Sequence, residues 1–227
     1  MERAVADNSK THQHHIKRYQ YAVGFIKGKR VCSVACGNGY GEHYMATHGE
    51  PEKIFAFDVD QGAVDNANQN QAHPLITFAT ADKLKELVED GSIDVFVSLE
   101  TIEHIKDDRG FLDTVWRTLK PGGLLIISTP NKASSFRNLY SVKPPNKFHV
   151  REYKKQEFVK LLTDKFTDVQ IFGQKPILKR SLTGLWKYLF YKFTGKLNEI
   201  EKDDFEIKPF PDDRAFDMAY LLATCRK

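Results

Sequence analysis

RVCSVACGNGYG, residues 30–41, is the stretch that decides the fold of this chain. Residues 30–35 form a short run with β-branched Val31 and Val34, and glycines follow at positions 37, 39 and 41. A glycine-rich turn that follows a strand and opens a helix lets the backbone approach a ligand without a side-chain clash. The stretch therefore predicts a strand, a ligand-binding loop and a helix, in that order.

Beyond this stretch, apolar runs typical of buried strands alternate with segments of helical periodicity. Apolar strands separated by helices describe a parallel sheet that is covered on both faces. The turn residues KPGG at 120–123 predict the end of one helix. The expected strands are 30–35, 54–57, 76–79, 93–99, 124–128, 169–172 and 218–224, and the expected helices are 42–47, 62–70, 83–89, 108–119 and 154–166.

Length and composition indicate a single domain, residues 1–227. The chain has 227 residues, of which 41% are hydrophobic, which is enough for one sizeable core and cramped for a second. The alternation of strands and helices breaks down over residues 174–213. We interpret these residues as an insertion between the sixth and seventh strands that serves as an acceptor lid or an interface.

Charge and cysteine content bear on partners and location. The formal net charge of +4, from 34 Lys and Arg against 30 Asp and Glu, is too small to argue for nucleic acid. Cys32, Cys36 and Cys225 have neither disulfide-framework nor metal-ligand spacing, which favours a reducing, cytoplasmic setting. No apolar run approaches the roughly 20 residues that span a bilayer, and the N-terminal region does not read as a signal peptide.

Asp58, which ends the second expected strand, completes a cofactor site with the glycine loop. It follows Gly37 by one strand-helix-strand unit, roughly 20 residues, and its carboxylate can accept hydrogen bonds from ribose hydroxyls. The dinucleotide fingerprint would need a glycine where this chain has Glu42, and a carboxylate at a helix start disfavours a pyrophosphate. S-adenosylmethionine has a sulfonium and no phosphate. The spacing therefore favours this methyl donor over NAD.

Three segments resemble, in order, motifs of the class I S-adenosylmethionine-dependent methyltransferases. Residues 31–41 resemble motif I, residues 93–104 (IDVFVSLETIEH) the motif IV region, and residues 119–131 (LKPGGLLIISTPN) the strand-five block. The resemblance covers about residues 16–173 and the final strand. It implies an enzyme of the α/β class with a Rossmann-like, seven-stranded, mostly parallel sheet, helices on both faces and the last strand antiparallel. It departs at Ser33, where the family usually has Asp, so the carboxylate that often organises the loop is missing.

The resemblance also implies which residues bind the cofactor. Asp58 would hold the ribose, and Asp82 would lie near the adenine amino group, with a helix N-cap as the alternative role for Asp82. Residues 1–28 match the family's N-terminal lid helix, in which Arg18 would pair with the cofactor carboxylate and Tyr19 or Tyr21 would cover it. A surface helix with aromatic packing is the alternative there. The expected cofactor-binding residues are Arg18, Tyr21, Ala35, Gly37, Gly39, Asp58, Val59, Asp82 and Leu99.

The methyl acceptor is expected where the fourth and fifth strands end. A hydroxyl acceptor must lose a proton, so a base is needed there. Glu100 and His104 follow the fourth strand, and His149 lies in the segment FHVREY, residues 148–153. A segment of this kind recurs in methyltransferases that resemble those of polysaccharide and O-antigen pathways. We expect His149 or His104 to be the base, with Glu100 as a further candidate, and a helix-capping loop histidine is the alternative for His149.

Glu100, Glu103 and His104 have a second interpretation. In the quinone-biosynthesis O-methyltransferases that this stretch resembles, the matching residues are associated with a divalent cation such as Mg²⁺. The alternative is that Glu103 and His104 hold the loop by hydrogen bonds.

The insertion carries a basic amphipathic pattern over residues 180–196. Leu182, Leu185, Trp186 and Leu189 recur at helical spacing, and the charged residues between them are basic. A helix of this kind can lie on a membrane surface, cover the active site or pair with a second subunit. We therefore expect a cytoplasmic enzyme that is a monomer or a homodimer, with peripheral membrane contact through residues 180–196 as a further alternative.

We expect O-methylation of a hydroxyl on a sugar or glycan intermediate, or on another small molecule. A phenolic or quinone O-methyltransferase that needs a divalent metal is one alternative. A catalytically silent methyltransferase fold that acts as a binding module is another, and an NAD-dependent oxidoreductase is disfavoured by the glycine spacing.

Overall fold

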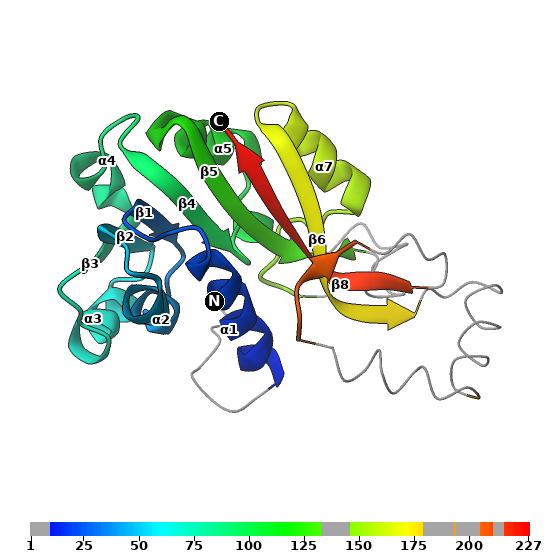
Figure 1. The fold of residues 1–227 in the computed structure, drawn as a ribbon, viewed down its shortest axis with the longest axis horizontal. Coiled ribbons are helices and arrows are strands. Elements are labelled where there is room, and N and C mark those ends of the chain that lie inside the picture. Colours follow the sequence, from blue (N-terminus) through cyan, green and yellow to red (C-terminus); the bar gives the residue numbers. More distant parts are fainter. Residues whose placement is uncertain (1–9, 133–145, 179–192, 194–204, 211–215) are drawn as a thin grey trace.

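The computed structural model describes residues 10–132, 146–178, 193, 205–210 and 216–227. These residues form one sheet with helices on both of its faces (Figure 1). The strands are β1 (Arg30–Val34), β2 (Lys53–Asp58), β3 (Ile76–Thr80), β4 (Ile93–Leu99), β5 (Leu119–Pro130), β6 (Thr167–Leu178), β7 (Lys208–Pro209) and β8 (Phe216–Arg226). The helices are α1 (Lys10–Val23), α2 (Tyr40–Gly49), α3 (Gln61–Asn70), α4 (Leu84–Leu87), α5 (Asp108–Thr118) and α7 (Lys155–Thr163), with 3₁₀ turns η1 (Ala81–Lys83) and η2 (Ile102–His104).

The strand order, β3-β2-β1-β4-β5-β8-β6-β7, confirms the expected α/β fold. β1 to β5 are parallel, β8 runs antiparallel to both β5 and β6, and β7 runs antiparallel to β6. β2 and β3 lie on one side of β1, and β4 and β5 lie on its other side, so the strand order reverses between β1 and β4. In open α/β sheets, ligands bind outside the carboxyl ends of the strands at this point.

Two of the expected boundaries are wrong. The sheet has eight strands in the described residues, because β7 adds a short edge strand inside the proposed insertion. Residues 174–178 also belong to the sheet, since β6 pairs with β8 as far as the Leu178–Phe216 position. The rest of the expected insertion, including most of 180–196, lies outside the described residues. Helix α5 ends at Thr118, as the turn residues at 120–123 predicted, but these residues belong to β5, which therefore starts at Leu119 instead of residue 124.

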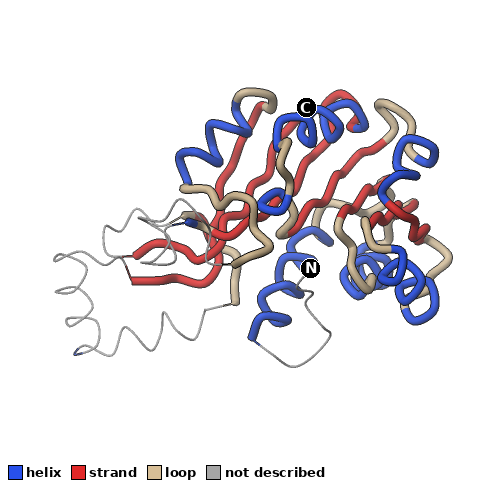
Figure 2. The backbone as a smooth tube through the Cα atoms, turned by 180° about the vertical axis from the view of Figure 1, so that it is seen from behind, coloured by secondary structure: helices blue, strands red, loops and turns tan. Residues whose placement is uncertain are grey.

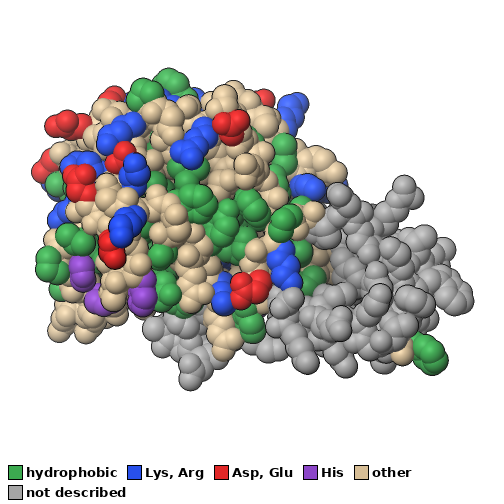
Figure 3. All heavy atoms as spheres, in the orientation of Figure 1, with side chains coloured by type: hydrophobic (Ala, Val, Ile, Leu, Met, Phe, Trp, Pro, Cys, Tyr) green, Lys and Arg blue, Asp and Glu red, His purple; other side chains and the backbone are tan. Residues whose placement is uncertain are grey.

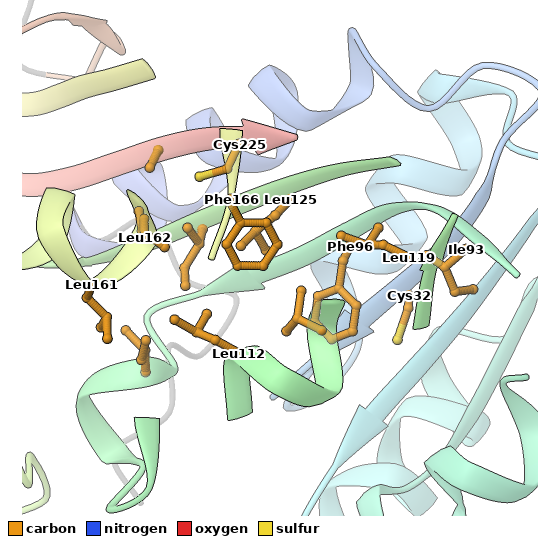
Figure 4. Packing of buried hydrophobic residues seen from close by; sticks show 14 of the residues in the cluster. Cys32, Ile93, Phe96, Leu112, Leu119, Leu125, Leu161, Leu162, Phe166 and Cys225 are labelled. Atoms are coloured by element: carbon orange, nitrogen blue, oxygen red, sulfur yellow. The ribbon is translucent and has the colours of Figure 1, made fainter. Parts of the chain in front are cut away.

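Alternate residues of the central strands enter two separate cores, as a sheet buried on both faces requires. One core packs the strands against α4, α5 and α7 and includes Phe96, Leu112, Leu161, Leu162 and Phe166 (Figure 4). The other packs the opposite face against α1, α2 and α3 and includes Val95 and Val97. Figure 2 shows the two layers of helices from behind. The N-terminal helix α1 is therefore part of the fold.

The remaining features agree with the charge and cysteine patterns. The three cysteines are buried and unpaired. Among the described residues, no helix has the length and apolar character needed to cross a membrane. Acidic and basic side chains are interspersed on the described part of the face in Figure 3 instead of forming one basic patch.

Candidate functional site

The glycine loop connects β1 to α2 and forms one wall of a cavity of about 810 Å³. Gly37 and Gly39 both have positive φ, 56° and 81°. A Cβ on Gly39 would lie 2.7 Å from the Phe78 ring, so only glycine fits there. Ala35 adopts φ 57° without being glycine, a conformation that costs of order 1–3 kcal/mol and is concentrated at ligand sites.

Asp58 fixes this loop from the end of the neighbouring strand β2. Its Oδ2 accepts the Gly37 N–H at 2.8 Å, and its Oδ1 accepts the Asp60 N–H at 3.0 Å. The side chain is buried, and it lines the cavity beside Val59. Each carboxylate oxygen keeps a further lone pair for a ligand hydroxyl. The arrangement agrees with the ribose contact expected for Asp58.

A buried carboxylate also lies below the loop, at a position that the motif did not predict. Ser33, on β1, donates a 2.6 Å hydrogen bond to Oε1 of Glu42, in the first turn of α2, and both residues are buried. Burial raises the pKa of Glu42 to about 7. Glu42 therefore points back into the protein at the base of the loop and is not part of the cavity wall.

The lid helix α1 contributes to the cavity through one of its two candidate covering tyrosines. Tyr19 and His15 line it, whereas Tyr21 packs against Phe25 and Phe172. The buried Arg18 is not part of the wall. The structure therefore has Tyr19 at the cavity, and Tyr21, which lies two residues further along the helix, is not part of the wall.

Arg18 instead ties three elements together beneath the cavity. Its guanidinium lies 3.1 Å from Oε1 of Glu100, its Nε donates to Gln174 on β6 at 2.9 Å, and it stacks over the Tyr220 ring of β8. Glu100 also accepts a 2.7 Å hydrogen bond from Ser128, and it has φ 52° without being glycine. A cofactor carboxylate would have to share Arg18 with Glu100.

The part of the cavity where the adenine is expected lies near η1. Leu99, Ala81 and Leu84 line the cavity, as expected for Leu99. Asp82 is exposed and lies outside the wall, next to Ala81. The cap residue of η1 is Thr80, so the alternative role of Asp82 as the helix N-cap is wrong.

The other end of the cavity is formed by Glu103, His104 and His149, which offer ligand atoms within 4.8 Å of one another. The two imidazole rings lie edge to face with centroids 4.9 Å apart. Glu103 is fully buried, and burial together with the nearby Glu100 carboxylate raises its pKa well above the usual range. The cluster of ligand atoms therefore contains His149 in place of the expected Glu100.

The hydrogen bonds of both histidines fix their tautomers. Nδ1 of His104 donates to the Phe148 carbonyl at 2.9 Å, and Nδ1 of His149 donates to the Glu152 carboxylate at 2.7 Å. In the neutral form of each ring the lone pair is then on Nε2, and Nε2 of His149 lies 3.1 Å from the Asn146 amide nitrogen. The N-cap of the neighbouring helix α7 is Lys154, so His149 does not have the helix-capping role that was its alternative.

The loop that carries His149 is fixed to the rest of the site. The Val150 N–H donates to the Glu103 carbonyl at 2.8 Å. Arg151 and the hydroxyl of Tyr153 both donate to Oδ2 of Asp108, at 2.7 Å and 2.9 Å. The supporting roles of Glu152 and Asp108 cannot be predicted from the sequence, because their partners lie on other elements or in an irregular loop.

The residues around the glycine loop fit S-adenosylmethionine. A Cβ at Gly37 would meet nothing within 4 Å, so space is open beside the loop backbone. Asn38 lines the cavity, and its buried Oδ1 has no hydrogen-bond partner among the described residues, which leaves it available to a ligand donor. In the cavity wall, Asp58 can accept hydrogen bonds from the ribose hydroxyls, and apolar side chains can pack against the adenine ring.

Comparison with known proteins agrees with this geometry. The family described as "Methyltransferase domain" matches residues 32–127. A probable S-adenosylmethionine-dependent methyltransferase of Mycolicibacterium smegmatis is 28% identical over 158 residues, covering 70% of this chain and 59% of the relative. A Mycobacterium tuberculosis protein with the same description is 32% identical over 156 residues, covering 68% and 55%. The chain thus spans less than two thirds of these relatives.

Solved structures share the fold. A Thermotoga maritima protein described as a possible histamine N-methyltransferase has a TM-score of 0.65 at 16% identity, covering 95% of this chain and 91% of that one. A Bacillus halodurans putative methyltransferase has a TM-score of 0.62 at 18% identity, covering 93% and 98%. At this level of identity, the likeness concerns the fold alone.

Proposed function

We propose that residues 32–127, which match the family described as "Methyltransferase domain", belong to a class I S-adenosylmethionine-dependent methyltransferase, and that the protein transfers the methyl group to a hydroxyl oxygen of a small molecule. One observation carries the proposal. A single cavity extends from the glycine loop and Asp58 to the imidazoles of His104 and His149. The strand order places the first pair beside β1 and β2 and the second beyond β4, so donor and acceptor would occupy neighbouring positions.

S-adenosylmethionine supplies a methyl group already activated by its sulfonium. The remaining tasks are to position the acceptor and to remove its proton. His149 is suited to the second task, because Glu152 holds its Nδ1–H and leaves the Nε2 lone pair at the cavity. His104 has the same arrangement with the Phe148 carbonyl. Oε1 of Glu100 is engaged by Arg18 and Ser128, so we assign Glu100 a positioning role.

The acceptor that we favour is a hydroxyl of a sugar or glycan intermediate. The support is the polar acceptor end and the likeness of residues 148–153 to segments in glycan methyltransferases. A phenol or quinone acceptor with a divalent metal is the second candidate, since a carboxylate and two imidazoles meet there. The membrane or dimer contact predicted for 180–196 bears on this choice, and liposome co-sedimentation of the wild type and Trp186→Ala tests it.

The test uses calorimetry and a transfer assay. We expect S-adenosylmethionine and S-adenosylhomocysteine to bind and NAD not to bind. His149→Ala and His104→Ala should keep cofactor affinity, and at least one should lose 100-fold or more in turnover on the best acceptor among nucleotide-sugars and catechols. Full turnover in both variants would remove the base assignment. Cofactor binding without transfer to any acceptor would favour the catalytically silent module.

A further inference from the structure

We propose that Glu103, His104 and His149 form a binding site for a divalent transition-metal cation at the acceptor end of the cavity. Glu103 and His104 belong to η2, and His149 lies in the loop before α7, 45 positions after His104. Each of the three residues lines the cavity. One ligand atom of each lies within 4.8 Å of the other two. Bonds of about 2.1 Å bring two ligands to within about 4.2 Å of each other, so a small side-chain rotation completes the site.

The hydrogen bonds around the cluster are those that metal ligands need. A histidine that binds a metal through one ring nitrogen donates the other N–H to a carboxylate or a backbone carbonyl. His149 donates to Glu152 and His104 donates to the Phe148 carbonyl, so Nε2 is the ring nitrogen that each histidine would offer to a cation. His149 would exchange its Asn146 contact for the cation.

Glu103 provides an independent observation. Its side chain is fully buried, its Oε2 accepts a hydrogen bond from Thr129 at 3.1 Å, and its Oε1 has no hydrogen-bond partner among the described residues. An unsatisfied buried carboxylate oxygen costs about 1–3 kcal/mol or more. A cation held jointly with two imidazoles would satisfy this oxygen.

The ligand set defines the class of cation. Two nitrogens and one oxygen suit Zn²⁺ or a divalent ion such as Co²⁺, and they differ from the all-oxygen sites of Mg²⁺. Three protein ligands would leave one position for a further ligand, as in catalytic zinc sites, and all three residues line the cavity. Only the role of the cation rests on the proposed function: an acceptor hydroxyl bound to the cation would ionise more readily. This would be an alternative to deprotonation by an imidazole base.

Metal binding can be measured without any methyl transfer. We expect the full chain, stripped of metal, to bind one Zn²⁺ in calorimetry and one Co²⁺ with the visible absorption of a nitrogen-oxygen site. Glu103→Gln, His104→Ala and His149→Ala should each weaken binding at least tenfold, and Glu152→Gln should weaken it 10–100-fold by releasing the His149 ring. Circular dichroism checks that each variant folds.

Two control variants separate this site from others. Glu100→Gln should keep Zn²⁺ affinity within a few-fold, because Glu100 is held by Arg18 and Ser128. The double variant His43→Ala/His73→Ala removes a pair of neighbouring histidines elsewhere on the surface and should leave binding unchanged. Absent binding, or binding that survives His149→Ala in a folded protein, would overturn the proposal. S-adenosylmethionine calorimetry on the same samples tests the cofactor site separately.

Discussion

The hydroxyl of Ser33 donates a 2.6 Å hydrogen bond to Oε1 of Glu42 beneath the glycine loop. Motif I, which residues 31–41 resemble, usually has an aspartate at position 33. Here the carboxylate comes from the first turn of α2 and contacts Ser33 on β1. The loop has therefore kept a buried carboxylate at its base, although the motif alone indicates that it was lost.

This carboxylate should make stability depend on pH. Burial raises the pKa of Glu42 to about 7, whereas in the unfolded chain it is about 4.5. The folded state thus retains a proton that the unfolded state has released, so the stability contributed by this group is full below pH 4.5 and is lost as the pH rises to 7. We compare the free energies of unfolding of the wild type and of Glu42→Gln. The value for the wild type minus that for Glu42→Gln should fall by about 3 kcal/mol between pH 4.5 and 7.5.

Urea denaturation at several pH values measures this difference. Glu86→Gln removes an exposed carboxylate from α4 and serves as the matched control. A wild-type minus Glu42→Gln difference that stays flat across the range, like that of the control, would contradict a buried carboxyl that titrates near neutrality.

Moving the carboxylate back to β1 provides a second prediction. Ser33→Asp puts two carboxyl groups in one buried space, and like charges cannot both ionise there without cost. We expect Ser33→Asp to destabilise the protein and Ser33→Asp/Glu42→Gln to recover most of the loss, with a coupling of about 1–3 kcal/mol. Calorimetry should show S-adenosylmethionine binding in the double variant. Purely additive effects would mean that the two side chains do not share a site.

The sequence predicted the cofactor half of the site better than the acceptor half. The glycine loop and Asp58 are predictable because each terminates its own strand, and parallel strands end at one edge of a sheet. The Ser33–Glu42 bond was missed, because a helix-start carboxylate was assumed to face the ligand. The proximity of His104 and His149 is a long-range contact across an irregular loop, which residue periodicity does not reveal. The same holds for Arg18, whose partners Glu100 and Gln174 come from two other elements.

Asp58 should contribute to cofactor affinity more than to stability. Its two oxygens accept the N–H groups of Gly37 and Asp60, and an amide can replace only one of them. Since hydrogen bonds to charged groups contribute about 1.5–3 kcal/mol, we expect Asp58→Asn to weaken S-adenosylmethionine binding by 10–100-fold in calorimetry. Asp60→Ala is the control: it removes the N-cap of α3 and should cost about 1 kcal/mol of stability with unchanged affinity.

The ion pair of Arg18 with Glu100 should anchor the lid helix. Arg18 is 1% exposed and the Glu100 side chain 13%, so the loss of Arg18 leaves a largely desolvated charge on Glu100 without its ion-pair partner; breaking a buried pair in this way typically costs about 3–5 kcal/mol. We expect Arg18→Met to reduce the free energy of unfolding by about that amount and Arg18→Met/Glu100→Gln to be less damaged. Equal stabilities of the single and double variants would show that the pair is not coupled.

Gly41 tests whether α1 is packed onto the glycine loop. A Cβ at Gly41 would lie 2.0 Å from Cζ of Tyr19, a residue that lines the cavity. Alanine is favoured over glycine inside a helix by about 1 kcal/mol, so Gly41→Ala would stabilise α2 if α1 were absent from this position. With Tyr19 in place, we expect destabilisation by about 1–3 kcal/mol and weaker S-adenosylmethionine binding, because α1 must shift. Tyr19→Ala/Gly41→Ala should be more stable than Tyr19→Ala alone, since the methyl group then meets open space. If Gly41→Ala stabilises the wild-type background instead, α1 does not close over the loop in solution.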